Sequence, residues 1–104
     1  MDQDTITKTI AKFKQSLESL GITVEQIILF GSHASGTPRQ DSDIDIIVIS
    51  DSFAAKSYWE RVELLSEAIY EVYAPIEASA FTLEEWESGK SLMVNYAKDG
   101  VIVT

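Results

Sequence analysis

Apolar residues in the first half of the chain follow two different periods. Between Ile6 and Leu20 they recur at helical spacing, and Gly21 stands where such a helix would end. Two runs rich in β-branched residues follow, at 24–30 and 43–49, and each predicts a buried strand. The pattern therefore predicts an amphipathic helix followed by two strands, with a turn region between the strands.

A second helical stripe begins after the second strand. Asp51 or Ser52 is expected to cap this long helix, and Pro75 is expected to break it. The residues at helical spacing predict one buried face. They are Ala55, Tyr58, Val62, Leu65, Ile69 and Val72.

The last part of the chain changes period over short stretches. Residues 76–81 predict a third strand, and Thr82-Leu-Glu-Glu85 has the sequence of a capping box, with Gly89 ending the short helix. One or two helical turns are expected over residues 91–98, and the final apolar residues 101–104 predict a fourth strand at an edge of the sheet.

This order of elements predicts the α/β (α+β) class, with a small mixed sheet of about four strands and helices packed on it. The 104 residues fit a single domain over 1–104, and no cysteine is present to form disulfides or thiolate metal sites. The polar N-terminus has no apolar signal segment, and no run approaches the roughly 18 apolar residues of a membrane span. We therefore expect a cytoplasmic protein without membrane contact.

The chain carries 8 basic and 17 acidic residues, a formal charge of −9. Such an acidic protein lacks the positive surface that duplex nucleic acid requires, so direct duplex binding is not expected. The negative charge either serves solubility alone or includes acids that hold a divalent metal. Net charge does not decide between these two interpretations.

Two acids are placed at the start of the most apolar strand. Asp43 and Asp45 alternate along it and would share one face, with Cα atoms about 6.6 Å apart. Carboxylates on a half-buried strand are costly unless they are paired or bound to metal. Oxygen ligands at this spacing suit a pair of Mg²⁺ or Mn²⁺ ions. Alternatively, the strand begins later and the acids are solvated at the end of a loop.

The turn after the first strand has the composition of a phosphate-binding corner. Gly31 permits close backbone approach, Ser32 offers a hydroxyl and an N–H, and Gly36 follows nearby. The segment lacks the Gly-Lys-Ser/Thr of a P-loop and the middle glycine of a dinucleotide fingerprint. By itself it is either a site for phosphate oxygens or a plain turn.

Taken together, Gly31-Ser32-x-Ala34-x-Gly36 and the later Ser42-Asp43-x-Asp45 resemble the minimal nucleotidyltransferase (MNT) family of the DNA polymerase β-like superfamily. The resemblance covers residues 24–104. It implies transfer of a nucleoside monophosphate from a nucleoside triphosphate, with ATP as the expected donor, to a hydroxyl group. A phosphate cradle beside metal-binding acids is what metal-bridged phosphates need.

The resemblance also implies roles for particular residues. Gly31, Ser32 and Gly36 would bind the phosphates. Family loops carry arginines where this chain has His33 and Ser35, and Arg39 is the nearest residue that would compensate.

A metal site is implied in the same way. Asp43 and Asp45 would hold two Mg²⁺ ions, or Mn²⁺, and a third acid is expected on a neighbouring strand. Glu77 is the only acid in the predicted third strand, although many family members carry Asp there. We therefore predict Asp43, Asp45 and Glu77 as metal ligands and catalytic residues.

Minimal members of the family often pair with an α-helical HEPN-type protein as the antitoxin of a toxin–antitoxin couple. The resemblance therefore implies such a partner, with one of its tyrosines as the acceptor, and is compatible with a homo-oligomer. A second hypothesis is a weakly active or inactive module that acts by docking on a helical partner. Exposed aromatics such as Tyr58, Trp59 or Trp86 would favour that second hypothesis.

Overall fold

The structure is a computed structural model that describes residues 3–31, 33, 43–89, 92–97 and 100–104, with only the backbone described at 92 and 96. None of the helices in these ranges is long and apolar enough to cross a membrane. The helices and strands are α1 (Gln3–Ser19), β1 (Gln26–Phe30), β2 (Ile44–Ile49), the 3₁₀ helix η1 (Asp51–Phe53), α3 (Tyr58–Val72), β3 (Ile76–Phe81), α4 (Leu83–Ser88), α5 (Leu92–Ala97) and β4 (Val101–Ile102).

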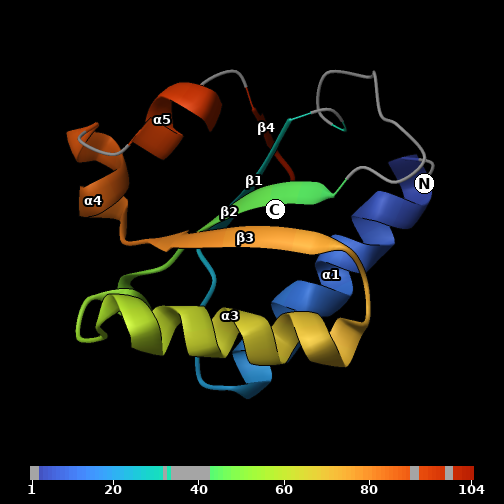
Figure 1. Ribbon diagram of the computed structural model, residues 1–104, viewed down its shortest axis with the longest axis horizontal. Helices are drawn as coiled ribbons and strands as arrows, with labels where there is room; N and C mark the ends of the chain where they lie inside the picture. The colour runs from blue at the N-terminus through green and yellow to red at the C-terminus, as the bar shows by residue number, and fades with distance from the viewer. Residues whose placement is uncertain (1–2, 32, 34–42, 90–91, 98–99) are drawn as a thin grey trace.

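The strands form one mixed sheet in the order β3-β2-β1-β4 (Figure 1). β1 runs antiparallel to both β2 and β4, whereas β2 and β3 are parallel. The predicted class and the small mixed sheet of four strands are confirmed. The C-terminal strand β4 lies at one edge, as the sequence indicated, and β3 lies at the other.

Helices cover the two faces of the sheet unequally (Figure 1). On one face, α1 and α3 enclose the main core with Ile44, Ile46 and Val48 of β2. On the other face, Ile47 and Ile49 join a smaller cluster beneath α4 and α5. Because β2 is buried on both faces over most of its length, it is the central strand that fixes whatever side chains stand at its start.

The long helix begins later than the sequence pattern predicted. Asp51 and Ser52 belong to η1, which is capped by Ser50, and α3 begins at Tyr58 after its own cap, Ser57. Ser57 forms a capping box with Glu60, in which each side chain satisfies the other's backbone N–H. The prediction of Asp51 or Ser52 as the cap was therefore wrong.

The predicted buried face of this helix was wrong at its start as well. Ala55 precedes α3 and is exposed, and the Tyr58 side chain is 69% exposed. Later positions behave as predicted, because Leu65 is buried and Ile69 and Val72 pack against the main core. The first turn of α3 therefore presents aromatic surface to solvent instead of filling the core.

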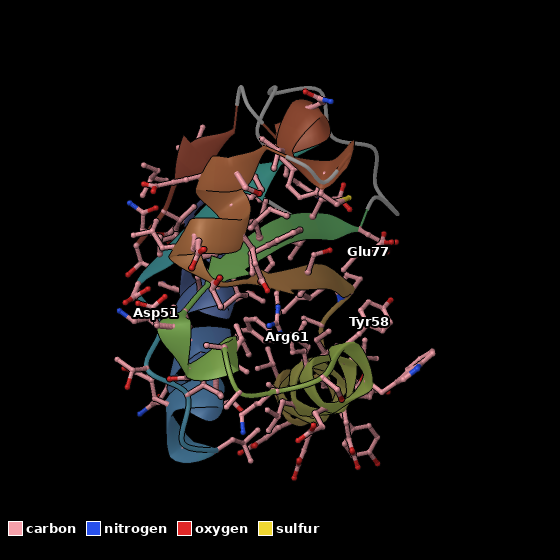
Figure 2. The ribbon with its side chains drawn as sticks, turned by 90° about the vertical axis from the view of Figure 1, so that its left-hand side faces the viewer. Asp51, Tyr58, Arg61 and Glu77 are labelled. Carbon is pink, nitrogen blue, oxygen red and sulfur yellow. The ribbon has the colours of Figure 1, made fainter. Side chains whose placement is uncertain are left out.

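Arg61 ties the start of α3 to the rest of the molecule. Its guanidinium donates to the backbone oxygens of Phe53 and Lys56, at 2.8 and 3.2 Å, and to both carboxylate oxygens of Glu85, at 2.6 and 3.0 Å. The Arg61 side chain is only 13% exposed. Glu85 also accepts a hydrogen bond from the backbone N–H of Thr82, the N-cap residue of α4. One side chain thus links η1, α3 and α4 (Figure 2).

Replacing Arg61 with alanine should destabilise the protein by about 2 kcal/mol, because it leaves charged and carbonyl acceptors without their donor. Chemical unfolding followed by circular dichroism measures this free energy. A matched control is Lys8→Ala, which removes the exposed ion pair between Lys8 and Asp4. That change should cost less than about 0.5 kcal/mol. Equal losses in the two variants would contradict the central role of Arg61.

Candidate active site

Two acids from neighbouring strands lie side by side on the face of the sheet that α4 and α5 partly cover. Asp45 of β2 pairs in register with Glu77 of the parallel strand β3. Paired residues of adjacent strands point to the same face, about 4.8 Å apart across the sheet. Asp45 is half-buried and Glu77 is exposed. The structure therefore brings together two of the three acids that the sequence predicted for the site.

The pKa of the Asp45 carboxyl is raised in this environment. Burial raises its pKa above the ordinary value of 3.8, and the negative charges of Glu77 and Asp43, with a hydrogen bond to Glu77, raise it further. The charge of His33 acts in the opposite direction. Concentrated negative charge of this kind is often associated with functional sites.

Asp43 directly precedes β2 and is exposed, since the strand begins at Ile44 and not at residue 43. The expectation of a late strand start therefore holds for Asp43, whereas Asp45 lies within the strand. The charge of Asp43 still influences the Asp45 pKa. Asp45 thus interacts electrostatically with both of the other acids at the start of the parallel strand pair.

His33 is a neighbour of this site whose importance the sequence did not reveal. It is 4% exposed, and its charge lowers the pKa of Asp45. The sequence marked His33 only as a replacement for a loop arginine. A lone histidine three residues after a strand gives no signal of its own, because its proximity to Asp45 depends on how β1 and β2 pair.

Gly31 directly follows β1 and lies next to the carboxylate of Asp45. Its φ is +76°, and a Cβ built on it would collide with the carboxylate of Asp45. Only glycine adopts this conformation freely and leaves that space open. In the structure Gly31 makes room for an acid, in addition to any contact with phosphate. The other predicted phosphate-binding residues, Ser32, Gly36 and Arg39, lie outside the described residues.

The donor set of the site is suited to a hard divalent cation. Carboxylate oxygens without sulfur ligands are what Mg²⁺ and Mn²⁺ prefer. A cation would offset both the burial and the neighbouring negative charges that raise the Asp45 pKa. Across the described part of the chain, no three His, Asp or Glu side chains are grouped closely enough to hold a metal by themselves. The side chains that fit a metal best are the adjacent pair Asp45 and Glu77.

The site combines acids from two adjacent strands with a glycine that follows a third strand. This arrangement is typical of enzymes that transfer phosphoryl and nucleotidyl groups. The sequence agrees: the nucleotidyltransferase domain family matches residues 10–98. The chain belongs to that family, and its class of activity is nucleotidyl transfer. A search of curated proteins gave no match.

Several solved structures are similar to this chain, including two that match over most of its length. One is a protein from Sulfolobus solfataricus assigned as a nucleotidyltransferase, with 21% identity and a TM-score of 0.72 over 96% of this chain and 80% of that one. The other belongs to a toxin–antitoxin structure with AMP-PNP, with 21% identity and a TM-score of 0.64 over 94% of this chain and 72% of that one. At this identity the two likenesses show the shared fold.

Proposed function

We propose that the protein transfers a nucleoside monophosphate, AMP from ATP, to a hydroxyl group with the help of divalent metal held by Asp43, Asp45 and Glu77. The observation that carries this proposal is the in-register pair of Asp45 and Glu77. Burial, followed by the charge of Glu77, raises the pKa of Asp45. Such a pair is costly in the free protein and becomes favourable when a cation binds.

When bound, Mg²⁺ would neutralise triphosphate charge and lower the pKa of the attacking hydroxyl. Asp45 is the central ligand, because it interacts with both other acids. Glu77 stands on the edge strand β3, on the side from which an acceptor would approach. Gly31 and the following Ser32 would orient the phosphates beside these acids.

The acceptor is proposed to be a tyrosine of a HEPN-type helical partner, with the present chain as the antitoxin. The similar toxin–antitoxin structure with AMP-PNP supports an adenine nucleotide and a partner protein of a toxin–antitoxin couple. The exposed aromatic pair at the start of α3 supports docking on a partner protein. Tyr58 and Trp59 are 69% and 74% exposed, with ring centroids 5.0 Å apart.

The same pair also supports the second candidate, a module that docks without turnover. Trp86 does not support docking, because it packs within the smaller core cluster. Its ring centroid lies 5.5 Å from that of Phe81. The two candidates differ in one measurable property, the transfer of label from ATP.

The test uses ATP labelled at the α-phosphate, Mg²⁺ and a HEPN-type protein as acceptor. The variants Asp43→Ala and Glu77→Gln should each lower transfer by at least about 100-fold, because each removes a proposed metal ligand. Glu77→Asp should restore part of the activity, since it keeps a carboxylate that is one methylene shorter. Incorporated label on the acceptor gives the rate.

Asp51→Asn is a matched control for these variants. Asp51 is also an exposed acid next to β2, but it follows the opposite end of the strand. Figure 2 shows Asp51 and Glu77 on opposite sides of the molecule. Full activity is expected for Asp51→Asn. Persistent transfer in Glu77→Gln would remove Glu77 from the site, and partner binding without any transfer would favour the docking module.

A further inference from the structure

The outer side of β3 carries backbone groups that the sheet does not use. The oxygens of Pro75 and Phe81 accept hydrogen bonds from the N–H groups of Ile44 and Ser50, at the two ends of the parallel pair. Backbone direction alternates along a strand, so the odd-numbered residues of β3 face β2. The N–H and C=O groups of Ala78 and Ala80 therefore point away from the sheet.

This edge lacks the features that usually protect an open strand. The register with β2 is continuous from Ile76 to Phe81, so β3 contains no bulge. Its middle residues are Ala78, Ser79 and Ala80, which are small and uncharged. In the described ranges, no backbone or side-chain hydrogen bond is made to the outward groups of Ala78 and Ala80. The edge is thus a template for one more strand.

A groove of about 760 Å³ runs along this edge. Its floor is formed by residues 78–81, and its walls come from the start of α3 and from the region of α4 and α5. Tyr58 and Val62 line one wall, and Ser88 and Met93 line the other. Figure 2 shows Tyr58 and Arg61 on the α3 side of this space. The volume lies in the range of ligand-binding clefts.

On β3, the lining of the groove begins at Ala78, the residue after Glu77. Glu77, Ser79 and Phe81 share one face of β3, so the Cα atom of Glu77 lies about 6.6 Å from that of Ser79. A strand added to the outer edge would lie about 4.8 Å from β3. Its residue opposite Glu77 would place a side chain on the same face as Glu77 and Asp45. The next residue on that face would lie over Ser79.

We propose that the acceptor binds in this groove as an extended polypeptide strand added to β3, with a hydroxyl-bearing residue opposite Glu77 and an apolar residue two positions away. This inference rests on the proposed nucleotidyl transfer. The acceptor hydroxyl oxygen forms a bond to the α-phosphorus of ATP, and the bond from that phosphorus to the bridging oxygen breaks. Pyrophosphate leaves with the electron pair, and the hydroxyl proton passes to water.

The net charge of the protein indicates which kind of strand would bind in the groove. The chain carries a formal charge of −9, so pairing of β3 with β3 of a second copy would bring two strongly acidic proteins together. A segment with lysines beside its apolar residues would be attracted instead, because the protein is acidic overall and the adjacent acids Asp45 and Glu77 lie next to residues 78–81. We therefore assign the groove to a basic, strand-forming segment of another protein.

The test uses fluorescein-labelled seven-residue peptides of alternating threonine and valine, with one tyrosine at a varied position and a lysine at each end. Binding is measured by anisotropy without ATP. Peptides that are N-methylated at the residues facing β3 should bind at least about tenfold more weakly, because each loses a backbone donor. N-methylation at the intervening residues should leave affinity nearly unchanged. Only strand pairing produces such an alternating pattern.

A variant of the protein tests the same contact from the other side. Ala80→Pro removes the outward N–H and leaves the bonds to β2 intact, a position at which an edge strand tolerates proline. It should weaken peptide binding at least about tenfold. Ala80→Val adds a side chain close to proline in size but retains the N–H, so it should bind the peptide at least about tenfold more tightly than Ala80→Pro does. Circular dichroism confirms that both variants fold.

The outcomes separate this inference from the proposed function. Alternating binding without label transfer would support the groove and contradict the enzyme. Transfer to a HEPN-type protein that Ala80→Pro does not change, or the absence of binding by every peptide, would overturn the strand-binding groove and leave the enzyme standing. A homodimer that Ala80→Pro dissociates would also overturn it, because the edge would then be an interface between two copies.

Discussion

Asp45→Asn is expected to abolish nucleotidyl transfer while making the metal-free protein more stable at neutral pH. The activity should fall by at least about 1,000-fold, since asparagine keeps the shape of the side chain but removes the charge of the central metal ligand. The fold should survive, because Asp45 is only half-buried and its strand is held by the apolar residues on both sides.

The gain in stability follows from the sign of the pKa shift. Burial and the charges of Glu77 and Asp43 raise the pKa of Asp45 above 3.8, so the folded protein binds this proton more tightly than the unfolded chain does. Stability therefore decreases as the pH rises from 3.8 through the folded-state pKa, and the deficit remains at neutral pH. Asparagine cannot ionise and avoids this loss.

Thermal unfolding at several pH values, with EDTA present, measures the effect. The melting temperature of Asp45→Asn should exceed that of the unmodified protein at pH 7, and the difference should vanish below pH 3.8, where both folded and unfolded states are protonated. Added Mg²⁺ should stabilise the unmodified protein and not the variant. A variant that is less stable than the unmodified protein at pH 7 would show that the ionised Asp45 carboxylate does not destabilise the folded protein.

The parts of the fold that follow from short-range signals were predicted well. The strand at 76–81 and the capping box of Thr82 and Glu85 appear where the sequence placed them, and Gly89 ends α4 with a positive φ. The start of α3 was missed because several possible caps occur within a few residues. Phe53 turns into the core and Arg61 binds the backbone before the helix, which favours the later cap Ser57.

The site depends on contacts that no short segment contains. The sequence could place Asp45 and Glu77 on strands, but it could not show that these strands are neighbours, parallel and in register. For the same reason it did not indicate that His33 acts on Asp45. Gly31 was predicted as part of a phosphate-binding corner, and its closeness to the Asp45 carboxylate appears only when β1 and β2 pair.

Gly31→Ala should remove activity as completely as a change in the acids, although alanine carries no chemistry of its own. Its Cβ would occupy the space of the Asp45 carboxylate and force that side chain away from Glu77. We expect transfer to fall by at least about 100-fold, because displaced ligands hold metal poorly. The free energy of unfolding should also fall, since a non-glycine residue in this conformation costs about 1–2 kcal/mol.

Gly89→Ala is the control that separates the two causes. Gly89 also has a positive φ, +66°, but nothing lies within 4 Å of a Cβ built there. Gly89→Ala should therefore lose stability by about 1–2 kcal/mol through its backbone alone and keep full activity. Loss of activity in both variants would mean that reduced stability, and not the position of Asp45, inactivates the protein.

A double substitution tests whether glycine is needed at position 31 to leave room for the Asp45 carboxylate. In Asp45→Ala the colliding oxygen is absent, and the remaining Cβ lies 3.4 Å from the added carbon, an ordinary contact distance. Gly31→Ala should then cost no more than Gly89→Ala does, whereas in the unmodified protein it should cost measurably more. Chemical unfolding of the four proteins gives this coupling directly. If Gly31→Ala costs the same with and without the carboxylate, then its effect is confined to the backbone, and the end of β1 does not position Asp45.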